Sequence, residues 1–165
     1  MSEDKNFINL IGNFQEDLRH VDESIAIALN AHLQIEGSID DYLKSIFAHP
    51  KYLEGARLSF FDKFSIARAY TPASHGRPEW EMMALINTIR NKIAHRRRDK
   101  APQIDTGRLR SIMHESFEKL RVELKDADPK EVMAYAAAIC CGFLLLLKEQ
   151  VSQTERVQIR EEDSE

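Results

Sequence analysis

The stretch from Asp128 to Leu147 reads DPKEVMAYAAAICCGFLLLL and decides the fold class of the chain. It begins with a strong helix start, because Asp128 can cap free amide groups, Pro129 suits the first turn, and Glu131 can bond back to the cap. The 16 residues that follow Glu131 carry no charge, whereas a helix that spans a bilayer needs about 18 to 20 apolar residues. We therefore expect a buried central helix that ends near Gln150, and no membrane-spanning segment.

Apolar residues elsewhere recur at steps of three and four, which is the spacing of helices with one buried face. The longest such stripe comprises Phe14, Leu18, Val21, Ile25, Ala28, His32, Ile35, Ile39, Tyr42 and Ile46. Gly37 and Ser38 lie within it and could bend or split the helix, because glycine weakens a helix interior by roughly 1 kcal/mol. Shorter stripes predict further helices over 58–70, 79–97 and 106–124. The loops predicted between them cover 50–55, 71–78 and 99–104.

The composition is that of a soluble globular protein, with 43% apolar and 30% charged residues in a chain of 165. A formal net charge of −4 excludes a uniformly basic nucleic-acid binder but allows a local basic patch. Cys140 and Cys141 are adjacent and cannot join distant parts of the chain. In an apolar helix, where thiolates are disfavoured, we expect them to be inert packing residues. With no secretory signal at the start of the chain, a reducing cytoplasm is the simplest location.

No alternating strand pattern longer than four residues is present, so the predicted fold class is all-α. We expect a single-domain bundle of about five helices. The predicted organisation is a flexible N-terminus over 1–13, a helical domain over 14–150 and an acidic C-terminal tail over 151–165. The tail carries five carboxylates and two arginines from residue 155 onwards.

The third predicted helix contains LINTIRNKIAH, residues 85–95. At 100° per residue, Asn91 and His95 lie together on the side opposite the core stripe of the helix, and Arg90 lies on its flank. The outer half of the helix is also predicted to hold Trp80, Met83, Ala84, Asn87 and Ala94. Such a two-sided helix needs a second packing partner, either another helix of the chain or a second subunit.

The Arg-Asn-x-x-Ala-His spacing on this helix resembles the signature of HEPN domains. These are small helical bundles, usually dimeric, and many are metal-independent endoribonucleases in toxin–antitoxin, antiviral and RNA-processing systems. The chain is more specifically similar to the mannitol repressor-like branch, in which a Phe-rich helix (here LSFFDKFSIARAY, 58–70) precedes the motif, and a capped apolar helix closes the domain. The resemblance covers about residues 20–150. Toxins paired with nucleotidyltransferase antitoxins often carry Tyr where this chain has Arg97, so membership of that subgroup is not implied.

The resemblance implies a catalytic set of Arg90, Asn91 and His95 that acts on RNA without a metal ion or any other cofactor. An imidazole exchanges a proton near neutral pH, so His95 would be the general acid or base. The guanidinium of Arg90 would stabilise charge on the phosphoryl oxygens, and Asn91 would position the phosphate. The sequence shows no metal-ligand spacing and no glycine-rich phosphate loop. The alternative is structural: Arg90 pairs with a carboxylate, and the other two bond to backbone at a helix junction.

A basic cluster follows the motif directly and consists of Arg96, Arg97, Arg98 and Lys100. Residues 90–100 contain six basic residues and one acidic residue, so the rest of the chain carries about −9. We expect the cluster to bind the RNA backbone, with an affinity that falls as salt rises. The alternative is that these cations only complement the negative end of the helix dipole.

Two functions remain open on the sequence alone. The first is an endoribonuclease of HEPN type, a toxin or defence effector, that acts as a homodimer and has an antitoxin or regulatory protein as partner. The alternative is a non-catalytic regulator, similar to mannitol repressor, that binds protein or nucleic acid. Arg110 and His114 share a face of the fourth helix and either line the same cleft or serve only as surface residues. His32 lies on an apolar stripe and is expected to be a hydrogen-bonded core residue.

Overall fold

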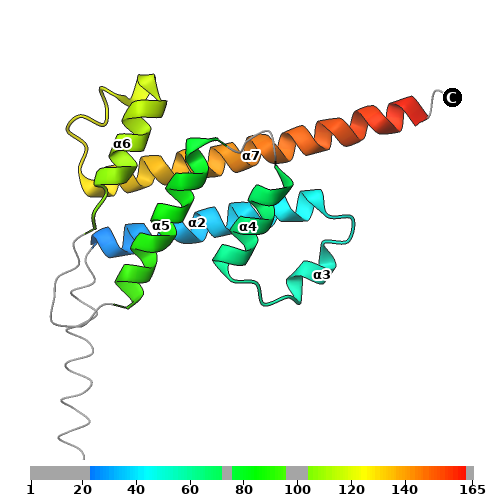
Figure 1. The fold of residues 1–165 in the computed structure, drawn as a ribbon, viewed down its shortest axis with the longest axis horizontal. Coiled ribbons are helices and arrows are strands. Elements are labelled where there is room, and N and C mark those ends of the chain that lie inside the picture. Colours follow the sequence, from blue (N-terminus) through cyan, green and yellow to red (C-terminus); the bar gives the residue numbers. More distant parts are fainter. Residues whose placement is uncertain (1–22, 72–75, 96–103, 163–165) are drawn as a thin grey trace, which may run out of the picture.

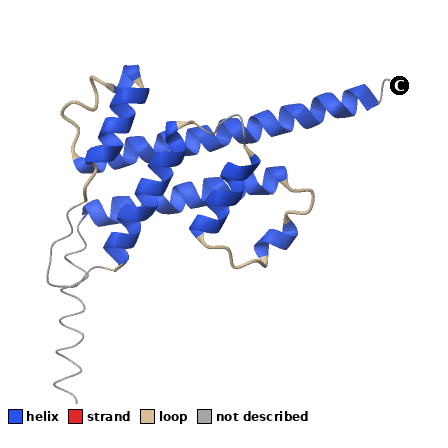
Figure 2. Ribbon diagram, in the orientation of Figure 1, coloured by secondary structure: helices blue, strands red, loops and turns tan. Residues whose placement is uncertain are grey.

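In a computed structural model of the protein, the described residues are 23–71, 76–95 and 104–162 (Figure 1). These parts contain six α-helices, one short 3-10 helix and no β-strand, which confirms the all-α class (Figure 2). The predicted flexible segment 1–13 and the first turns of the first predicted helix lie outside the described residues.

Two long helices, α2 (Glu23–Ile46) and α7 (Pro129–Glu162), lie side by side and run in the same direction (Figure 1). An ion pair between Lys130 and Glu23 joins their starting ends. α2 passes through Gly37 and Ser38 without a break, and the Ser38 hydroxyl donates to the carbonyl of Gln34 at 3.0 Å. The predicted stripe of α2 is confirmed, because the core includes Ala28, His32, Ile35, Ile39 and Tyr42.

The predicted start of α7 is also confirmed in atomic detail. Oδ1 of Asp128 accepts hydrogen bonds from the amides of Lys130 and Glu131 at 2.8 and 2.9 Å, and the Glu131 carboxylate accepts from the amide of Asp128 at 2.8 Å. The predicted end near Gln150 is wrong, since the helix continues to Glu162. Residues 148–162 contain neither proline nor glycine, so no local signal ends the helix there.

α7 is buried on one face only. By length and composition, Pro129–Gln153 is apolar enough to cross a membrane, with a mean hydropathy of 1.8, a test that core helices of soluble proteins also pass. Its inner face packs against α2 and α5 (Pro78–Ala94) through residues such as Met133, Cys140 and Leu144. Its outer face exposes Leu145 and Leu146. The prediction of a buried central helix is therefore confirmed for the inner face alone.

α4 (Phe60–Tyr70) and α5 cover one side of the α2–α7 pair (Figure 1). The Trp80 ring packs edge-on against Phe64 of α4 and Phe143 of α7, with centroids 5.6 and 5.2 Å apart. Trp80 and Met83, both predicted on the outer half of this helix, are instead fully buried. Because α4 and α7 flank the first turns of α5 on different sides, the outer face of this end is reduced to exposed residues such as Glu81 and Ala84.

The start of α5 holds a buried carboxylate that the sequence analysis did not single out. Glu79 is only 2% exposed, and its two oxygens accept hydrogen bonds from the guanidinium of Arg77 at 2.5 and 3.1 Å. The same guanidinium lies over the ring of Phe143, 5.4 Å from its centroid. Hydrogen bonding to Glu79 raises the pKa of Arg77. Because Arg77 contacts both Glu79 and the Phe143 ring, it links the start of α5 to α7.

The remaining segments differ from prediction in two places. A short helix, α3 (Lys51–Glu54), lies within the predicted loop at 50–55. The predicted helix ending at Leu124 is wrong: α6 (Gly107–Ser116) ends early, and a 3-10 helix, η2 (Glu118–Leu120), follows it. The chain turns back at Phe117 (φ −127°, ψ 87°), which brings Leu124 into the core.

Candidate functional site

The second half of α5 carries the residues of the predicted catalytic set. Nη1 of Arg90 donates to Oδ1 of Asn91 at 3.2 Å, so these two side chains are brought together. Arg90 is half-buried and Asn91 is exposed. Among the residues that the structure describes, no carboxylate pairs with Arg90. The structural alternative, in which Arg90 forms an ion pair with a carboxylate, therefore finds no partner in this part of the chain.

His95 lies at the C-terminal cap of α5, one turn after Asn91. Its amide donates to the carbonyl of Asn91 at 3.0 Å, while its side chain is exposed. Within the described ranges the imidazole makes no hydrogen bond, so it is not held by Arg90 or by the Asn91 amide. The basic cluster of Arg96, Arg97, Arg98 and Lys100 lies outside the described residues.

His32 of α2 contacts α5 at Asn87, which lies one turn before Asn91 on the same side of the helix. It is 5% exposed, and its Nε2 lies 3.1 Å from Oδ1 of Asn87, which confirms the expected hydrogen-bonded core histidine. Its ring also packs on Phe60, with centroids 4.6 Å apart, and its Nδ1 lies 3.9 Å from a carboxylate oxygen of Glu36. The amide oxygen accepts, so Nε2 carries the proton.

The environment of His32 keeps its ring neutral. Burial lowers the pKa of His32 below its usual 6.5, and the charge of Arg90 acts in the same direction. The hydrogen bond to Asn87 and the charge of Glu36 oppose this shift without cancelling it. The ring thereby links α2 to the helix of Arg90 through an uncharged contact. The sequence signal for this link was a histidine on an apolar stripe, but the partner Asn87 could not be identified from it.

Three large apolar side chains close in sequence to this contact are exposed. Leu29 and Leu33 precede and follow His32 on α2, and Phe61 follows the Phe60 ring that packs on it. Leu33 is 63% exposed and Phe61 is 67% exposed. Large exposed apolar side chains grouped on a surface are typical of sites that bind another protein.

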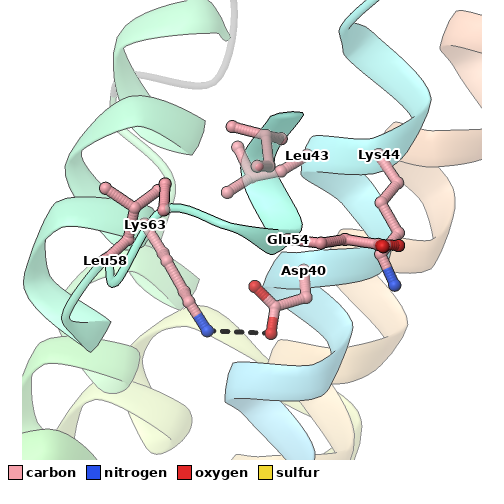
Figure 3. Close-up of a pocket in the computed structure, with 8 residues that line it drawn as sticks. Asp40, Leu43, Lys44, Glu54, Leu58 and Lys63 are labelled. Carbon is pink, nitrogen blue, oxygen red and sulfur yellow. Dashed lines mark hydrogen bonds and ion pairs between the residues drawn. The ribbon is translucent and has the colours of Figure 1, made fainter. Parts of the chain in front are cut away.

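A pocket of about 370 Å³ lies between α2, α3 and α4 (Figure 3). Nζ of Lys63 donates to carboxylate oxygens of Asp40 and Glu36, both at 2.9 Å. Burial lowers the pKa of Lys63, but the two carboxylates outweigh this effect and the net shift is upward. The lining holds two cations, Lys44 and Lys63, and two carboxylates, Asp40 and Glu54, so the pocket has no excess charge of either sign to bind an ionic ligand.

Arg110 and His114 line a different pocket, of about 510 Å³, formed by α6 and the turn that follows it. No residue of α5 is among the described residues that line it, so these side chains do not share a cleft with Arg90 and His95. Arg110 instead has a structural contact: its guanidinium donates to the carbonyls of Leu124 and Ala127.

Metal-ligating side chains do not gather in the described parts of the chain, where no group of three or more His, Cys, Asp or Glu is placed to hold an ion. The thiol of Cys140 is buried, which raises its pKa, and it lies 3.7 Å from the carbonyl of Glu79. A thiol in this environment is a packing group rather than a nucleophile.

The end of α5 thus offers a cation, an amide and an exposed imidazole within the six residues 90–95. A cation and an amide can hold a phosphate, and an imidazole can exchange a proton with it. The same groups can also bind an anionic partner without reacting. Comparison with known proteins does not separate these uses, because the chain matches no protein-family model, no curated protein and no solved structure.

Proposed function

We propose that the protein is a metal-independent endoribonuclease of HEPN type that acts as a cytoplasmic homodimer. The observation that supports this most is the contact between Arg90 and Asn91, next to the exposed His95, in a helix whose arginine has no carboxylate partner among the described residues. A guanidinium that is not neutralised in this way remains able to bind a phosphate.

The proposed reaction is an internal transfer within RNA. The 2′-oxygen attacks the adjacent phosphorus, the bond from phosphorus to the 5′-oxygen breaks, and a 2′,3′-cyclic phosphate and a 5′-hydroxyl result. The attacking hydroxyl loses a proton and the leaving oxygen gains one, so the step needs a base and an acid. His95 serves as one of them, Arg90 stabilises the charge on the phosphoryl oxygens, and Asn91 positions the phosphate.

A homodimer supplies the second proton-transfer group. One subunit offers one exposed imidazole at the end of α5, whereas two subunits with adjacent motifs offer two. The exposed apolar side chains of Leu29, Leu33 and Phe61, which are close in sequence to His32 and Phe60, favour a second copy at the surface of α2 and α4. Arg96, Arg97, Arg98 and Lys100 would then add backbone contacts to the RNA.

The second candidate is a non-catalytic regulator that binds a protein or a nucleic acid. The absence of a hydrogen bond between the His95 imidazole and Arg90 or Asn91 in the described residues favours it, because catalytic groups are usually positioned in advance. The exposed apolar side chains of α2 and α4 would then bind an antitoxin or another regulatory protein.

The deciding experiment incubates the purified chain with a mixed RNA pool in EDTA, beside His95→Ala and Arg90→Ala. Cleavage by the wild type, with cyclic phosphate ends, and loss of at least about 100-fold in both variants are expected. His49→Ala is the matched control, because His49 is an exposed histidine that the chain carries in the loop before α3. Cleavage by His95→Ala at the wild-type rate would refute the proposed role of this residue.

A further inference from the structure

The pocket beside α6 has an excess of positive charge. Its lining includes three cations, Arg110, Arg121 and Lys125, and one carboxylate, Glu115. Neither Arg121 nor Lys125 forms an ion pair within the described part of the chain. The pocket between α2, α3 and α4 differs in net charge, because its lining holds two cations, Lys44 and Lys63, and two carboxylates, Asp40 and Glu54.

Both guanidinium groups are held in place by the main chain. Arg110 donates to the carbonyls of Leu124 and Ala127, the latter at 2.5 Å, and Nε of Arg121 donates to the carbonyl of His114 at 3.0 Å. A guanidinium has five N–H groups, so the terminal nitrogens of Arg121 keep free donors. Side chains fixed before binding lose little further conformational entropy when a ligand arrives.

The fold does not need all three of these cations at the cavity. Arg110 alone ties α6 to the segment that returns towards α7. The Lys125 side chain makes no hydrogen bond or ion pair in the described residues, yet it lines the same cavity as the two arginines. Like charges gathered around one cavity repel each other, and a bound anion relieves that repulsion.

The volume and lining of the cavity restrict the kind of ligand that can bind. Its volume of about 510 Å³ falls within the range of small-molecule sites. Its lining is largely apolar, and because Leu124 is buried, the carbon stems of the long side chains supply most of this surface. The exposed polar residues Ser111 and His114 also line it. A ligand that fits has a doubly charged group at one end and a partly apolar body at the other.

We propose that this pocket binds a phosphate monoester of nucleotide size. The phosphate lies between Arg121 and Lys125, and the organic part lies against the apolar part of the lining. The same chemistry occurs in a free nucleoside monophosphate and in the phosphorylated end of an RNA strand. The proposal does not depend on nuclease activity at His95, because the two sites share no described residue.

Calorimetric titration with adenosine 5′-monophosphate tests the proposal. Saturable binding to one site per chain is expected, and Lys125→Gln and Arg121→Gln should each weaken it at least about tenfold. Lys119→Gln is the matched control, because Lys119 is an exposed lysine of η2 that does not line the pocket. Glu115→Gln should tighten binding, since it removes the one carboxylate that faces the phosphate.

Three further ligands test whether the pocket recognises the phosphate, and whether that phosphate belongs to a free nucleotide or to an RNA end. Adenosine, which has no phosphate, should not bind, whereas inorganic phosphate should compete with the nucleotide. A 5′-phosphorylated oligoribonucleotide that binds more tightly than the monophosphate assigns the site to RNA ends, and one that binds less tightly assigns it to free nucleotides. No saturable binding, or an equal loss in Lys119→Gln, would overturn the proposal. Lys125→Gln removes no fold contact, so its result does not depend on the folding of Arg121→Gln.

Discussion

Nε2 of His32 lies 3.1 Å from Oδ1 of Asn87, and this contact joins α2 to the helix that carries Arg90, Asn91 and His95. It is a polar contact inside an otherwise apolar packing surface, beside the ring of Phe60. Because a buried polar group without a partner costs about 1–3 kcal/mol, the pair favours one register of α5 on α2. The position of the candidate catalytic helix therefore depends on a histidine that does not belong to the motif.

The first prediction concerns the pH dependence of stability. The pKa of His32 is lower in the folded chain than its usual 6.5, so the unfolded chain binds the proton more readily. The contribution of the neutral ring to stability is complete above pH 6.5 and is lost as pH falls through the folded pKa. Urea unfolding of the wild type should therefore show a loss of stability below pH 6.5, and His32→Gln should lose less over the same range.

His95→Gln serves as the control for this measurement, because His95 is an exposed histidine on the adjacent helix. It should keep the pH profile of the wild type. An identical profile for His32→Gln would show that this ring does not cause the acid sensitivity.

The second prediction concerns the segment after α6. Arg110→Ala removes the donors to the carbonyls of Leu124 and Ala127, and should lower the free energy of unfolding by about 2–3 kcal/mol. Arg108→Ala removes only a surface ion pair with Glu81, 2.8 Å long, and should cost less than about 1 kcal/mol. Denaturant titration of both variants checks the difference, and equal losses would contradict the structural role of Arg110.

The third prediction concerns the proposed homodimer. Leu33→Asp places a charge on an exposed apolar residue beside the His32–Asn87 contact, and should convert the dimer to monomers. Leu146→Asp makes the same change on the outer face of α7, where the side chain is 57% exposed, and should leave the dimer intact. Analytical ultracentrifugation distinguishes them. Dissociation by Leu146→Asp alone would place the interface on α7 instead.

The fourth prediction concerns the basic cluster. If Arg96, Arg97 and Arg98 contact the RNA backbone, their replacement by Gln should reduce the salt dependence of RNA binding. For single strands, each contact contributes about 0.7 to the slope of log K against log salt, so the slope should fall by about 2. Fluorescence anisotropy at several salt concentrations measures this slope. An unchanged slope would mean that the cations only stabilise the end of the helix.

Several features of the fold could be predicted because they depend on neighbours in sequence. The capping of α7 by Asp128 and Glu131 involves residues three apart, and the observed bonds match the prediction. The apolar stripe of α2 predicts its buried face, because helical periodicity alone places those residues on one side. Arg90 and Asn91 are neighbours in sequence, which allows the hydrogen bond between their side chains. Whether a carboxylate from another helix pairs with Arg90 could not be predicted from the sequence.

Other features depend on contacts between distant segments, and the sequence analysis placed them wrongly or missed them. Trp80 was assigned to an outer surface because the stripe of its own helix excludes it, yet Phe64 and Phe143 enclose it from two other helices. Likewise, α6 ends at Ser116 without a glycine or proline, since the return of the chain is held by side chains such as Arg110 and Arg121.

The sequence by itself determined the all-α class, the start of α7, the buried stripe of α2 and the presence of an Arg-Asn-x-x-Ala-His helix. These follow from periodicity and capping, which act over three or four residues. Only the tertiary structure decided which helix faces are covered, that His32 meets Asn87, and that Arg110, Arg121 and Lys125 surround one cavity. Those outcomes depend on how helices pack across long separations in the chain, which local patterns do not encode.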